Sequence, residues 1–291
     1  MIEKNSCCKV NLLLNILGKR PDGFHELETI MHPVALHDRL SFERAGADIR
    51  LTCNDPSLPV NSKNLVFQAA ALFLAKAGIR DGVRIHLEKR LPIAAGLGGG
   101  SGNAAVTLMA LNELFGQPLT PPVLHELAAK LGSDIPFFLQ HRPALATGRG
   151  EIVRPLEPFP ALRTAHIILI HPGFGISTAW AYQELAHFPD ALNGRPGRAE
   201  KLALLLRGDD RAAAGREFYN SLEAPALYKY PLLGLFQEFL RENGAWAAMM
   251  SGSGSTTFAL TDTEETAQRL VGKFKIHFGD KFWIASVKMN G

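Results

Sequence analysis

The chain has 291 residues, of which 46% are hydrophobic and 20% are charged, a composition typical of a globular enzyme with one large or two medium domains. The formal net charge of +3 is spread along the chain without blocks of like charge, which argues against binding to a nucleic acid polymer. The longest apolar runs are too short to span a bilayer, and the N-terminus lacks the pattern of a signal peptide.

The first strong strand pattern lies at residues 9–17, where apolar residues at even positions alternate with Lys9, Asn11, Leu13 and Asn15. Two interpretations fit this alternation equally well. The largely polar face either lies against solvent or lines a wet cleft inside the protein. The turn signal Pro21-Asp-Gly23 follows, and a second extended stretch is expected at residues 26–34.

Farther along the chain, strand and helix patterns alternate, which favours an α/β or α+β architecture. Helices are expected at residues 61–77, 104–115, 120–132 and 263–274. Strands are expected at residues 83–87, 165–170, 247–250, 256–260 and 282–287. A proline-rich stretch at residues 142–163 marks the expected boundary between an N-terminal domain, 1–150, and a C-terminal domain, 151–291.

The segment Gly96-Leu-Gly-Gly-Gly-Ser-Gly102 lies between a strand-like stretch and a helix pattern. Glycine lets the backbone approach a ligand closely, and a helix N-terminus attracts anions, so the segment predicts a phosphate-binding loop rather than a merely flexible turn. Ser101 fits either as a helix cap or as a hydroxyl ligand to phosphate or its magnesium ion. A Walker A loop would continue with lysine where Asn103 stands, so this loop is of another type.

Phosphoryl transfer to a hydroxyl needs neutralisation of charge and often a carboxylate that takes the proton. Asp134 follows the helix stop at Gly132, and at a helix start the local dipole would keep such a carboxylate ionised. Taken alone, however, Asp134 fits a helix N-cap better than a catalytic role. Lys9, which taken alone is an ordinary surface lysine, could pair with this carboxylate and hold it charged.

Other polar features are less specific. A second glycine-rich segment, residues 251–255, lies between two strand patterns and fits either an anion-binding loop or a simple hairpin connection. The ten histidines show no metal-ligand spacing, and His25 stands out only because it follows the turn and Phe24. Three cysteines without a Cys-x-x-Cys pair predict reduced, partly buried thiols in a cytoplasmic protein.

Taken together, these motifs resemble the galactokinase, homoserine, mevalonate and phosphomevalonate kinase superfamily. The most specific stretch joins Lys9-Val-Asn-Leu to Lys19-Arg-Pro-Asp-Gly-Phe-His-Glu-Leu-Glu-Thr-Ile-Met31, which is similar to a single branch of that family. Residues 92–105 are similar to the family's phosphate loop, and Gly132-Ser-Asp-Ile-Pro-Phe resembles the segment with its catalytic aspartate. Shorter matching patches lie at residues 171–178, 220–223 and 251–258.

The resemblance implies an α+β fold with two domains. The N-terminal domain would be a ribosomal-protein-like α/β domain, the C-terminal domain would be ferredoxin-like, and the active site would lie in the cleft. It also implies ATP-dependent phosphorylation, with Mg²⁺, of a hydroxyl on a small cytidylyl methylerythritol, with no nucleic acid or membrane partner. By the same resemblance, Lys9 and Asp134 would take the active-site roles, Asp134 as the base or as the group that orients the hydroxyl.

The resemblance further implies two sets of binding residues. The loop around the ATP phosphates would comprise Pro92, Ile93, Ala94, Ala95, Gly96, Leu97, Gly98, Gly99, Gly100, Ser101 and Gly102, and the residues around adenine would be Asn64, Leu65 and Lys89. On the substrate side, Asn11 would lie near the reacting hydroxyl, and the cytosine would be held by Phe24, His25 and Tyr182.

Some positions depart from the family pattern. Phe24 stands where tyrosine is common, so stacking is retained and a hydroxyl is lost. Ala94 and Ala95 replace a more glycine-rich run, and Gly102 replaces a second serine, which removes any hydroxyl contact there. Two rival classes remain: another kinase of the superfamily, which would not need Arg-Pro-Asp-Gly-Phe-His, and a non-catalytic nucleotide- or RNA-binding module, which could dispense with Lys9 and Asp134.

Overall fold

The computed structural model describes residues 1–289, which form two compact units that are each assembled from separate stretches of chain. Unit 1 comprises Met1–Cys8, Leu36–Leu91 and Gly98–His141. Unit 2 comprises Lys9–Ala35, Pro92–Leu97 and the described residues from Arg142 onward. The units are discontinuous because the long strands β1 (Ile2–Lys19) and β2 (His25–Ala45) contribute residues to both.

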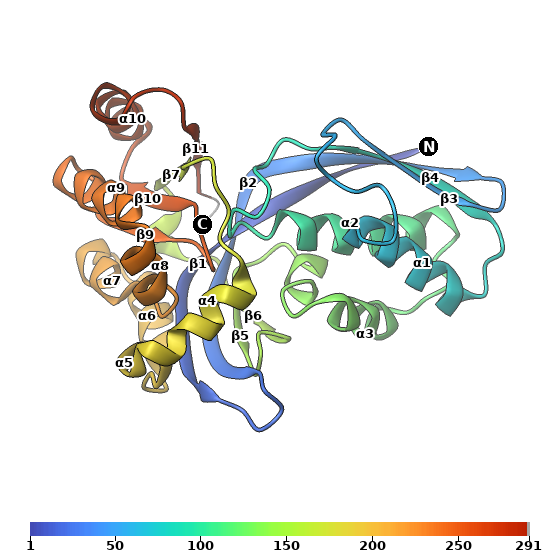
Figure 1. Cartoon of the computed structure of the whole chain (residues 1–291), viewed down its shortest axis with the longest axis horizontal. Coiled ribbons are helices and arrows are strands. Elements are labelled where there is room, and N and C mark those ends of the chain that lie inside the picture. The colour runs from blue at the N-terminus through green and yellow to red at the C-terminus, as the bar shows by residue number, and fades with distance from the viewer. Residues whose placement is uncertain (290–291) are drawn as a thin grey trace. The chain divides into compact units, whose positions relative to one another are not determined.

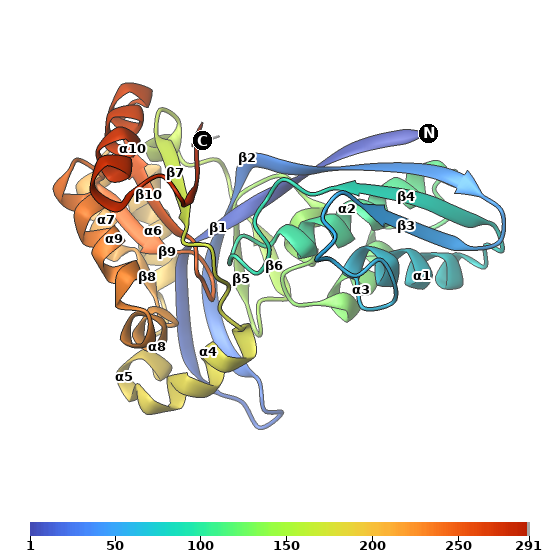
Figure 2. The same cartoon turned by 45° about the horizontal axis from the view of Figure 1, so that its top comes forward.

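In unit 1, three helices lie together on the same side of the strands (Figures 1 and 2). Strand β4 (Gly82–Glu88) pairs in parallel with β3 (Ile49–Cys53) and antiparallel with residues 39–45 of β2. The helices are α1 (Leu65–Ala77), α2 (Gly99–Leu114) and α3 (Pro121–Leu131). The strand predicted at residues 83–87 is confirmed, and it lies in the middle of this part of the sheet.

Capping residues explain the limits of α1. Helix α1 begins at Leu65 rather than at residue 61, because Asn64 is its N-cap and accepts the Val66 N–H at 2.9 Å. It ends where the sequence predicts, at Gly78, which adopts the left-handed conformation (φ 67°) that glycine tolerates. Helix α3 lies between Thr120 and Gly132, as predicted.

Helix α2 begins earlier than the sequence pattern indicates. Its start was predicted at residue 104, but the structure places it at Gly99, so that residues 99–102 form the first turn. Glycine is a poor helix former, yet close packing onto β1 outweighs that preference here. At Gly102 a Cβ would lie only 2.9 Å from the carbonyl oxygen of Cys7, so the helix can approach the strand only without a side chain.

Unit 2 contains an antiparallel sheet in the order β11–β7–β10–β9. These strands are β7 (His166–His171), β9 (Ala247–Met250), β10 (Thr257–Thr261) and β11 (Trp283–Lys288). Helices α9 (Pro231–Glu242) and α10 (Glu264–Phe278) pack on the sheet, and the rings of Phe236 and Phe274 meet edge to face with centroids 4.8 Å apart. The four strands predicted in this region are confirmed to within one residue at each end.

Two of the other strands of unit 2 pair directly with β1 or β2. Strand β8 (Tyr219–Asn220) runs parallel to β1, and β5 (Ala144–Thr147) pairs with both β2 and β6 (Ile152–Pro155). The predicted turn at residues 21–23 connects β1 to β2. The polar face of β1 is buried, since Lys9, Asn11 and Asn15 are 3%, 4% and 0% exposed, so the interpretation that this face lies against solvent is wrong.

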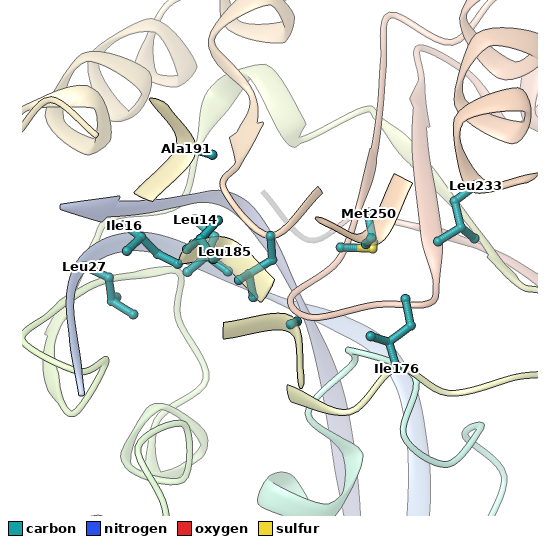
Figure 3. Close-up of a cluster of buried hydrophobic side chains, with 11 residues drawn as sticks. Leu14, Ile16, Leu27, Ile176, Leu185, Ala191, Leu233 and Met250 are labelled. Carbon is teal, nitrogen blue, oxygen red and sulfur yellow. The ribbon is translucent and has the colours of Figure 1, made fainter. Parts of the chain in front are cut away.

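A second apolar cluster of unit 2 packs on β1 and β2 (Figure 3). It joins Leu14 and Ile16 of β1 to Leu27 of β2, Leu233 of α9 and Met250 of β9. Shorter helices complete the unit: α4 (Thr178–Glu184), α5 (Pro189–Leu192), α6 (Arg198–Arg207), α7 (Arg211–Glu217) and α8 (Glu223–Lys229). Single 3₁₀ turns lie at Pro160–Leu162 and Leu185–His187 in unit 2, and another lies at Pro136–Leu139 in unit 1.

The three cysteines are free thiols, as predicted; Cys8 is buried, and Cys7 and Cys53 are partly buried. Burial raises the pKa of Cys8 to about 12, so its thiol stays protonated at neutral pH. Among residues 1–289, no helix has both the length and the apolar character that a membrane span requires.

One partly buried acid connects α8 to the sheet of unit 2. A carboxylate oxygen of Glu223 accepts the backbone N–H of Met250 at 2.7 Å and the side-chain amide of Gln237 at 2.6 Å. Burial of the carboxyl group raises the pKa of Glu223 from 4.5 to about 7. Between these two values the folded protein holds a proton that the unfolded chain releases.

The free energy of unfolding should therefore decrease as the pH rises from about 4.5 to about 7, by at most roughly 3 kcal/mol from this group. Glu223→Gln keeps an acceptor oxygen and cannot ionise, so it should flatten this pH dependence. Urea unfolding at pH 5 and pH 8 measures the change. Glu238→Gln, an exposed substitution on α9, is the control, and equal pH dependence in both variants would contradict the assignment.

Candidate active site

The glycine-rich run presents backbone amides at the first turn of α2. Gly98 is the N-cap in a left-handed conformation (φ 68°), and no side chain caps the helix. Gly102 donates its N–H to the Gly98 carbonyl at 2.8 Å, so the amides that precede it have no acceptor within the helix. The first turn also lacks an acidic residue, which leaves the positive end of the helix dipole available to an anion.

Ser101 lies within this first turn and is not the cap, so the capping interpretation of Ser101 is wrong. The Ser101 side chain is half-buried next to the helix N-terminus. The role that remains as a prediction is a hydroxyl ligand to phosphate or to its magnesium ion. The replacement of the family's second serine by Gly102 also has a physical reason. A serine there would bring its Cβ to 2.9 Å from both the Cys7 carbonyl oxygen and the Ser6 hydroxyl.

Unit 1 brings two of the predicted adenine residues to this turn. A Cβ on Gly100 would lie 3.6 Å from Leu65 Cδ1, and a Cβ on Gly99 would lie 3.2 Å from Lys89 Nζ. Asn64, the residue before Leu65, uses its side chain locally, because it caps α1 and donates to the Pro59 carbonyl at 2.8 Å. The three residues predicted around adenine thus belong to the same unit as the first turn of α2.

The ammonium group of Lys89 is buried and paired. Lys89 Nζ lies 2.5 Å from Asp38 Oδ2, and the two side chains are 7% and 0% exposed. Asp38 is not among the site residues predicted from the sequence. It stands at the alternate position between Leu36 and Leu40 of β2, and an acid within an alternating apolar series was the available signal.

In unit 2, the start of the glycine-rich segment is held by the connection between β9 and β10. Ser251 Oγ donates to the Gly96 carbonyl at 2.9 Å, and the Thr256 N–H donates to the Ala95 carbonyl at 3.2 Å. At Gly96 (φ 75°) a Cβ would lie 2.0 Å from the Ser251 carbonyl oxygen. Residues 251–255 form a hairpin connection, one of the two predicted alternatives, and their binding of an anion stays a prediction.

Lys9 and Asn11 lie beside the same hairpin in unit 2. Lys9 Nζ donates to Asn11 Oδ1 at 2.5 Å, and Asn11 Nδ2 donates to the Thr29 hydroxyl at 2.9 Å. A Cβ on Gly252 would lie 3.3 Å from Asn11 Oδ1 and 3.4 Å from Lys9 Nζ. Since Lys9 is buried, its interpretation as an ordinary surface lysine is wrong.

A further polar residue supports this hairpin. Asn220 Nδ2 donates to the carbonyls of Met250 and Gly252 at 2.9 Å and 2.7 Å, and its side chain is 2% exposed. Its Oδ1 accepts the Leu222 N–H at 2.9 Å. In the sequence, Asn220 stands out only as part of a short family patch, whereas its contacts identify it as the residue that fixes the start of the hairpin.

Asp134 lies in unit 1, in the turn between α3 and the 3₁₀ turn Pro136–Leu139. The N-cap of that turn is Ile135, so the capping interpretation of Asp134 is wrong. The Asp134 side chain is half-buried, and the preceding turn is closed by the Ile135 N–H, which donates to the Gly132 carbonyl at 3.2 Å. Asp134 therefore belongs to unit 1, whereas Lys9 belongs to unit 2.

The predicted cytosine residues lie in unit 2 near the turn between β1 and β2. Phe24 is 51% exposed, so its ring does not lie in the core. The Arg149 guanidinium lies over its ring, with Cζ 4.5 Å from the centroid, a contact that the sequence analysis did not anticipate. The rings of His25 and Tyr182 lie 5.0 Å apart at 37°.

The protonation of His25 follows from its surroundings. Burial lowers the pKa of His25 below its ordinary value of 6.5, and the nearby charge of Lys19 lowers it further. The imidazole is therefore neutral at pH 7, with one nitrogen that donates and one that accepts. A neutral ring of this kind can hydrogen-bond the edge of a nucleobase.

Residues 1–289 contain no group of three His, Cys, Asp or Glu side chains that could hold a metal ion by themselves. Mg²⁺ is commonly bound through substrate phosphates with one or two protein oxygens. The hydroxyl of Ser101 beside the first turn of α2 is one such oxygen.

Two family models match the chain: the GHMP kinases N terminal domain at residues 64–142 and the GHMP kinases C terminal at residues 191–280. The 4-diphosphocytidyl-2-C-methyl-D-erythritol kinase of Pelotomaculum thermopropionicum is 42% identical over 268 residues, which cover 92% of this chain and 91% of the relative. The kinase of the same name from Synechococcus sp. (strain JA-3-3Ab) is 40% identical, with 97% and 93% covered.

Solved structures show the same relationship. A crystal structure of a 4-(cytidine 5'-diphospho)-2C-methyl-D-erythritol kinase is 34% identical and has a TM-score of 0.77, with 98% of both chains covered. A homoserine kinase from Cytophaga hutchinsonii has a TM-score of 0.71 at 21% identity, with 98% of this chain and 96% of that chain covered, which shows a shared fold. The two-domain α+β kinase fold expected from the sequence is thereby confirmed.

The geometry at Gly99 predicts a selective effect on ATP. In Gly99→Val, the new side chain would press on Lys89 Nζ at 3.2 Å, which its ion pair with Asp38 holds in place, and would obstruct the first turn of α2. ATP binding should weaken roughly tenfold or more, about 1.4 kcal/mol, while binding of the second substrate changes little. Calorimetric titration of each ligand measures this.

Gly272→Val is the matched control, since Gly272 lies in α10 and has open space around the position of a Cβ. Equal losses of both affinities in Gly99→Val, with intact folding, would contradict the prediction.

Proposed function

The chain belongs to the 4-diphosphocytidyl-2-C-methyl-D-erythritol kinases of the GHMP kinase family, and we propose that it transfers the γ-phosphoryl group of ATP to the 2-hydroxyl of 4-diphosphocytidyl-2-C-methyl-D-erythritol. It is an ATP-dependent small-molecule kinase of isoprenoid biosynthesis. The observation that carries the proposal in the structure is the uncapped glycine-rich first turn of α2 beside Leu65 and Lys89.

The ATP half of the proposal rests on unit 1. The amides of Gly99, Gly100 and Ser101 bind phosphate oxygens and stabilise the charge that develops on the transferred group. Leu65 supplies an apolar contact next to Gly100, where the adenosine of a bound nucleotide would be held. Lys89 contributes positive charge, which its pairing with Asp38 keeps at a fixed position.

The acceptor half rests on Asp134 and on Lys9 with Asn11. Asp134 orients the hydroxyl and takes its proton as the O–P bond forms. Lys9, held by Asn11 at 2.5 Å, provides a positive charge for the reacting groups, and Asn11 lies close to the hydroxyl. Phosphoryl transfer is catalysed mainly by position and charge, so buried, hydrogen-bonded side chains of this kind suit it.

Mg²⁺ supplies charge neutralisation at the ATP phosphates when it is bound. We propose that it is held through the phosphates and the Ser101 hydroxyl, in line with its preference for oxygen ligands and water. We also propose that the enzyme works in the cytoplasm, a location that its three free thiols support.

The cytidylyl group is assigned to Phe24, His25 and Tyr182. The exposed face of Phe24 can stack on a pyrimidine, and the neutral ring of His25 can hydrogen-bond its edge. Tyr182 packs against His25 and holds that ring in place. The Arg149 guanidinium on the Phe24 ring adds positive charge near a ligand that carries a diphosphate.

A coupled assay of ADP release tests the activity itself. The purified protein is given ATP and Mg²⁺ with 4-diphosphocytidyl-2-C-methyl-D-erythritol, with methylerythritol phosphate, with homoserine or with mevalonate. We expect turnover with the cytidylyl compound alone. Equal turnover with methylerythritol phosphate, which lacks cytidine, would refute the assignment of the substrate.

Asp134→Asn should lower kcat by roughly 100- to 10,000-fold, the usual cost of losing a general base, and should leave the affinity for ATP within a few-fold. Steady-state kinetics with both substrates varied gives both values. Asp81→Asn, an exposed substitution in the same unit, is the control and should behave like the unsubstituted protein. A near-normal kcat in folded Asp134→Asn would remove Asp134 from the mechanism.

Phe24→Ala should raise KM for the cytidylyl substrate about 5- to 150-fold, since stacking of a base on an aromatic ring contributes about 1–3 kcal/mol. KM for ATP should hardly change. Phe24→Tyr keeps the stacking face and should be nearly neutral, and the control Tyr228→Ala removes a more exposed ring elsewhere. If Phe24→Ala lowers the melting temperature and spares KM, the ring serves stability and not recognition.

A further inference from the structure

Asp38 accepts hydrogen bonds from four donors, although it is fully buried on β2. Its Oδ1 accepts the backbone N–H groups of Arg90 and Leu91 at 2.8 Å and 2.9 Å. Its Oδ2 accepts from Lys89 Nζ at 2.5 Å and from Asn103 Nδ2 at 3.0 Å. A buried carboxylate is costly unless it is paired and hydrogen-bonded, and all four donors converge on this one group.

These donors come from the two ends of the glycine-rich segment. Residues 89–91 directly precede Pro92, and Asn103 directly follows Gly102. The side chain of Asn103 is 2% exposed, and its Oδ1 has no hydrogen-bond partner among the described residues, so the bond from Nδ2 to Asp38 is what orients it. One carboxylate therefore ties together the residues on either side of the loop 92–102.

The same carboxylate lies close to Gly99 in the first turn of α2. A Cβ on Gly99 would lie 3.2 Å from Lys89 Nζ and 3.7 Å from Asp38 Oδ2. The ion pair is thus in contact with the first turn of α2, where the free amides are.

We propose that Asp38 is a positioning residue of the kinase, which closes the base of the phosphate loop and sets the position of Lys89 and of the α2 amides before ATP arrives. The inference rests on the proposed binding of ATP phosphates at this loop. Closing the loop in the absence of ligand lowers the entropy that is lost on binding, because the loop is already ordered when ATP arrives. Asp38 itself touches no phosphate in this role.

Asp38→Asn tests the inference because an amide cannot serve both pairs of donors. Whichever way the amide is turned, its NH₂ group faces two N–H donors in place of an acceptor. We expect the affinity for AMP-PNP, a non-hydrolysable ATP analogue, to fall on the order of tenfold in calorimetry with Mg²⁺ present. KM for the cytidylyl substrate should change much less.

Glu28→Gln is the matched control. Glu28 is 5% exposed and also accepts four hydrogen bonds on its two oxygens, from Asn15 Nδ2 and from the N–H groups of residues 197–199 at the start of α6. The control should lose stability in the same way without a selective loss of AMP-PNP affinity. Equal effects of Asp38→Asn and Glu28→Gln on AMP-PNP affinity would overturn the proposal.

Asn103→Ala removes only the hydrogen bond between Asp38 and the residue that follows the loop. This variant provides a second test if Asp38→Asn fails to fold. Hydrogen exchange of residues 92–102 in the nucleotide-free protein should become faster in Asn103→Ala, and AMP-PNP affinity should fall with it. Unchanged exchange in a protein that binds AMP-PNP normally would refute the role of Asp38. Faster exchange in Asn103→Ala, combined with an unsubstituted protein that does not bind AMP-PNP, would instead refute the proposed ATP site.

Discussion

The absence of a side chain at two glycines sets the shape of the phosphate loop, on which the rest of the site depends. At Gly96 the backbone packs against the Ser251 carbonyl in unit 2, and at Gly102 it packs against the Cys7 carbonyl in unit 1. Both contacts are between backbone atoms. A side chain at either position could be accommodated only if the backbone moved, and not by a change of side-chain rotamer. The loop therefore has little freedom to adopt another shape.

Buried polar side chains on β1 and β2 show that these strands build the candidate site as well as the hydrophobic core. Lys9, Asn11 and Asp38 stand at positions that a purely structural strand would fill with apolar residues. Each forms a hydrogen bond with another residue of the candidate site: Lys9 donates to Asn11, and Asp38 accepts from Lys89. Since an unpaired buried polar group is costly, these pairings fix the side chains in one arrangement.

The fold by itself does not select the acceptor, because a homoserine kinase shares it at low sequence identity. The side chains assigned to the cytidylyl group lie instead near the turn between β1 and β2, where Phe24 is exposed and His25 packs on Tyr182. A turn tolerates substitution better than a buried strand does, which makes it a suitable place for specificity.

The sequence by itself determined the order and type of most elements and the membership of the family. Periodicity, caps and turns act over a few residues, so strand 247–250, the turn at 21–23 and the end of α1 at Gly78 could be predicted. The motifs at residues 9–31, 92–105 and 132–137 identified the family for the same reason, since each is contiguous. The division at residue 150 stays a prediction.

Only the tertiary structure decided how the site residues are paired. Asp38 binds donors at residues 89–91 and 103, far away in the sequence, and no local pattern contains that pairing. The start of α2 at Gly99 and the burial of Lys9 likewise depend on strands and hairpins that arrive from elsewhere in the chain. Local patterns encode which conformation a segment prefers, whereas burial and pairing depend on which distant segments pack against it.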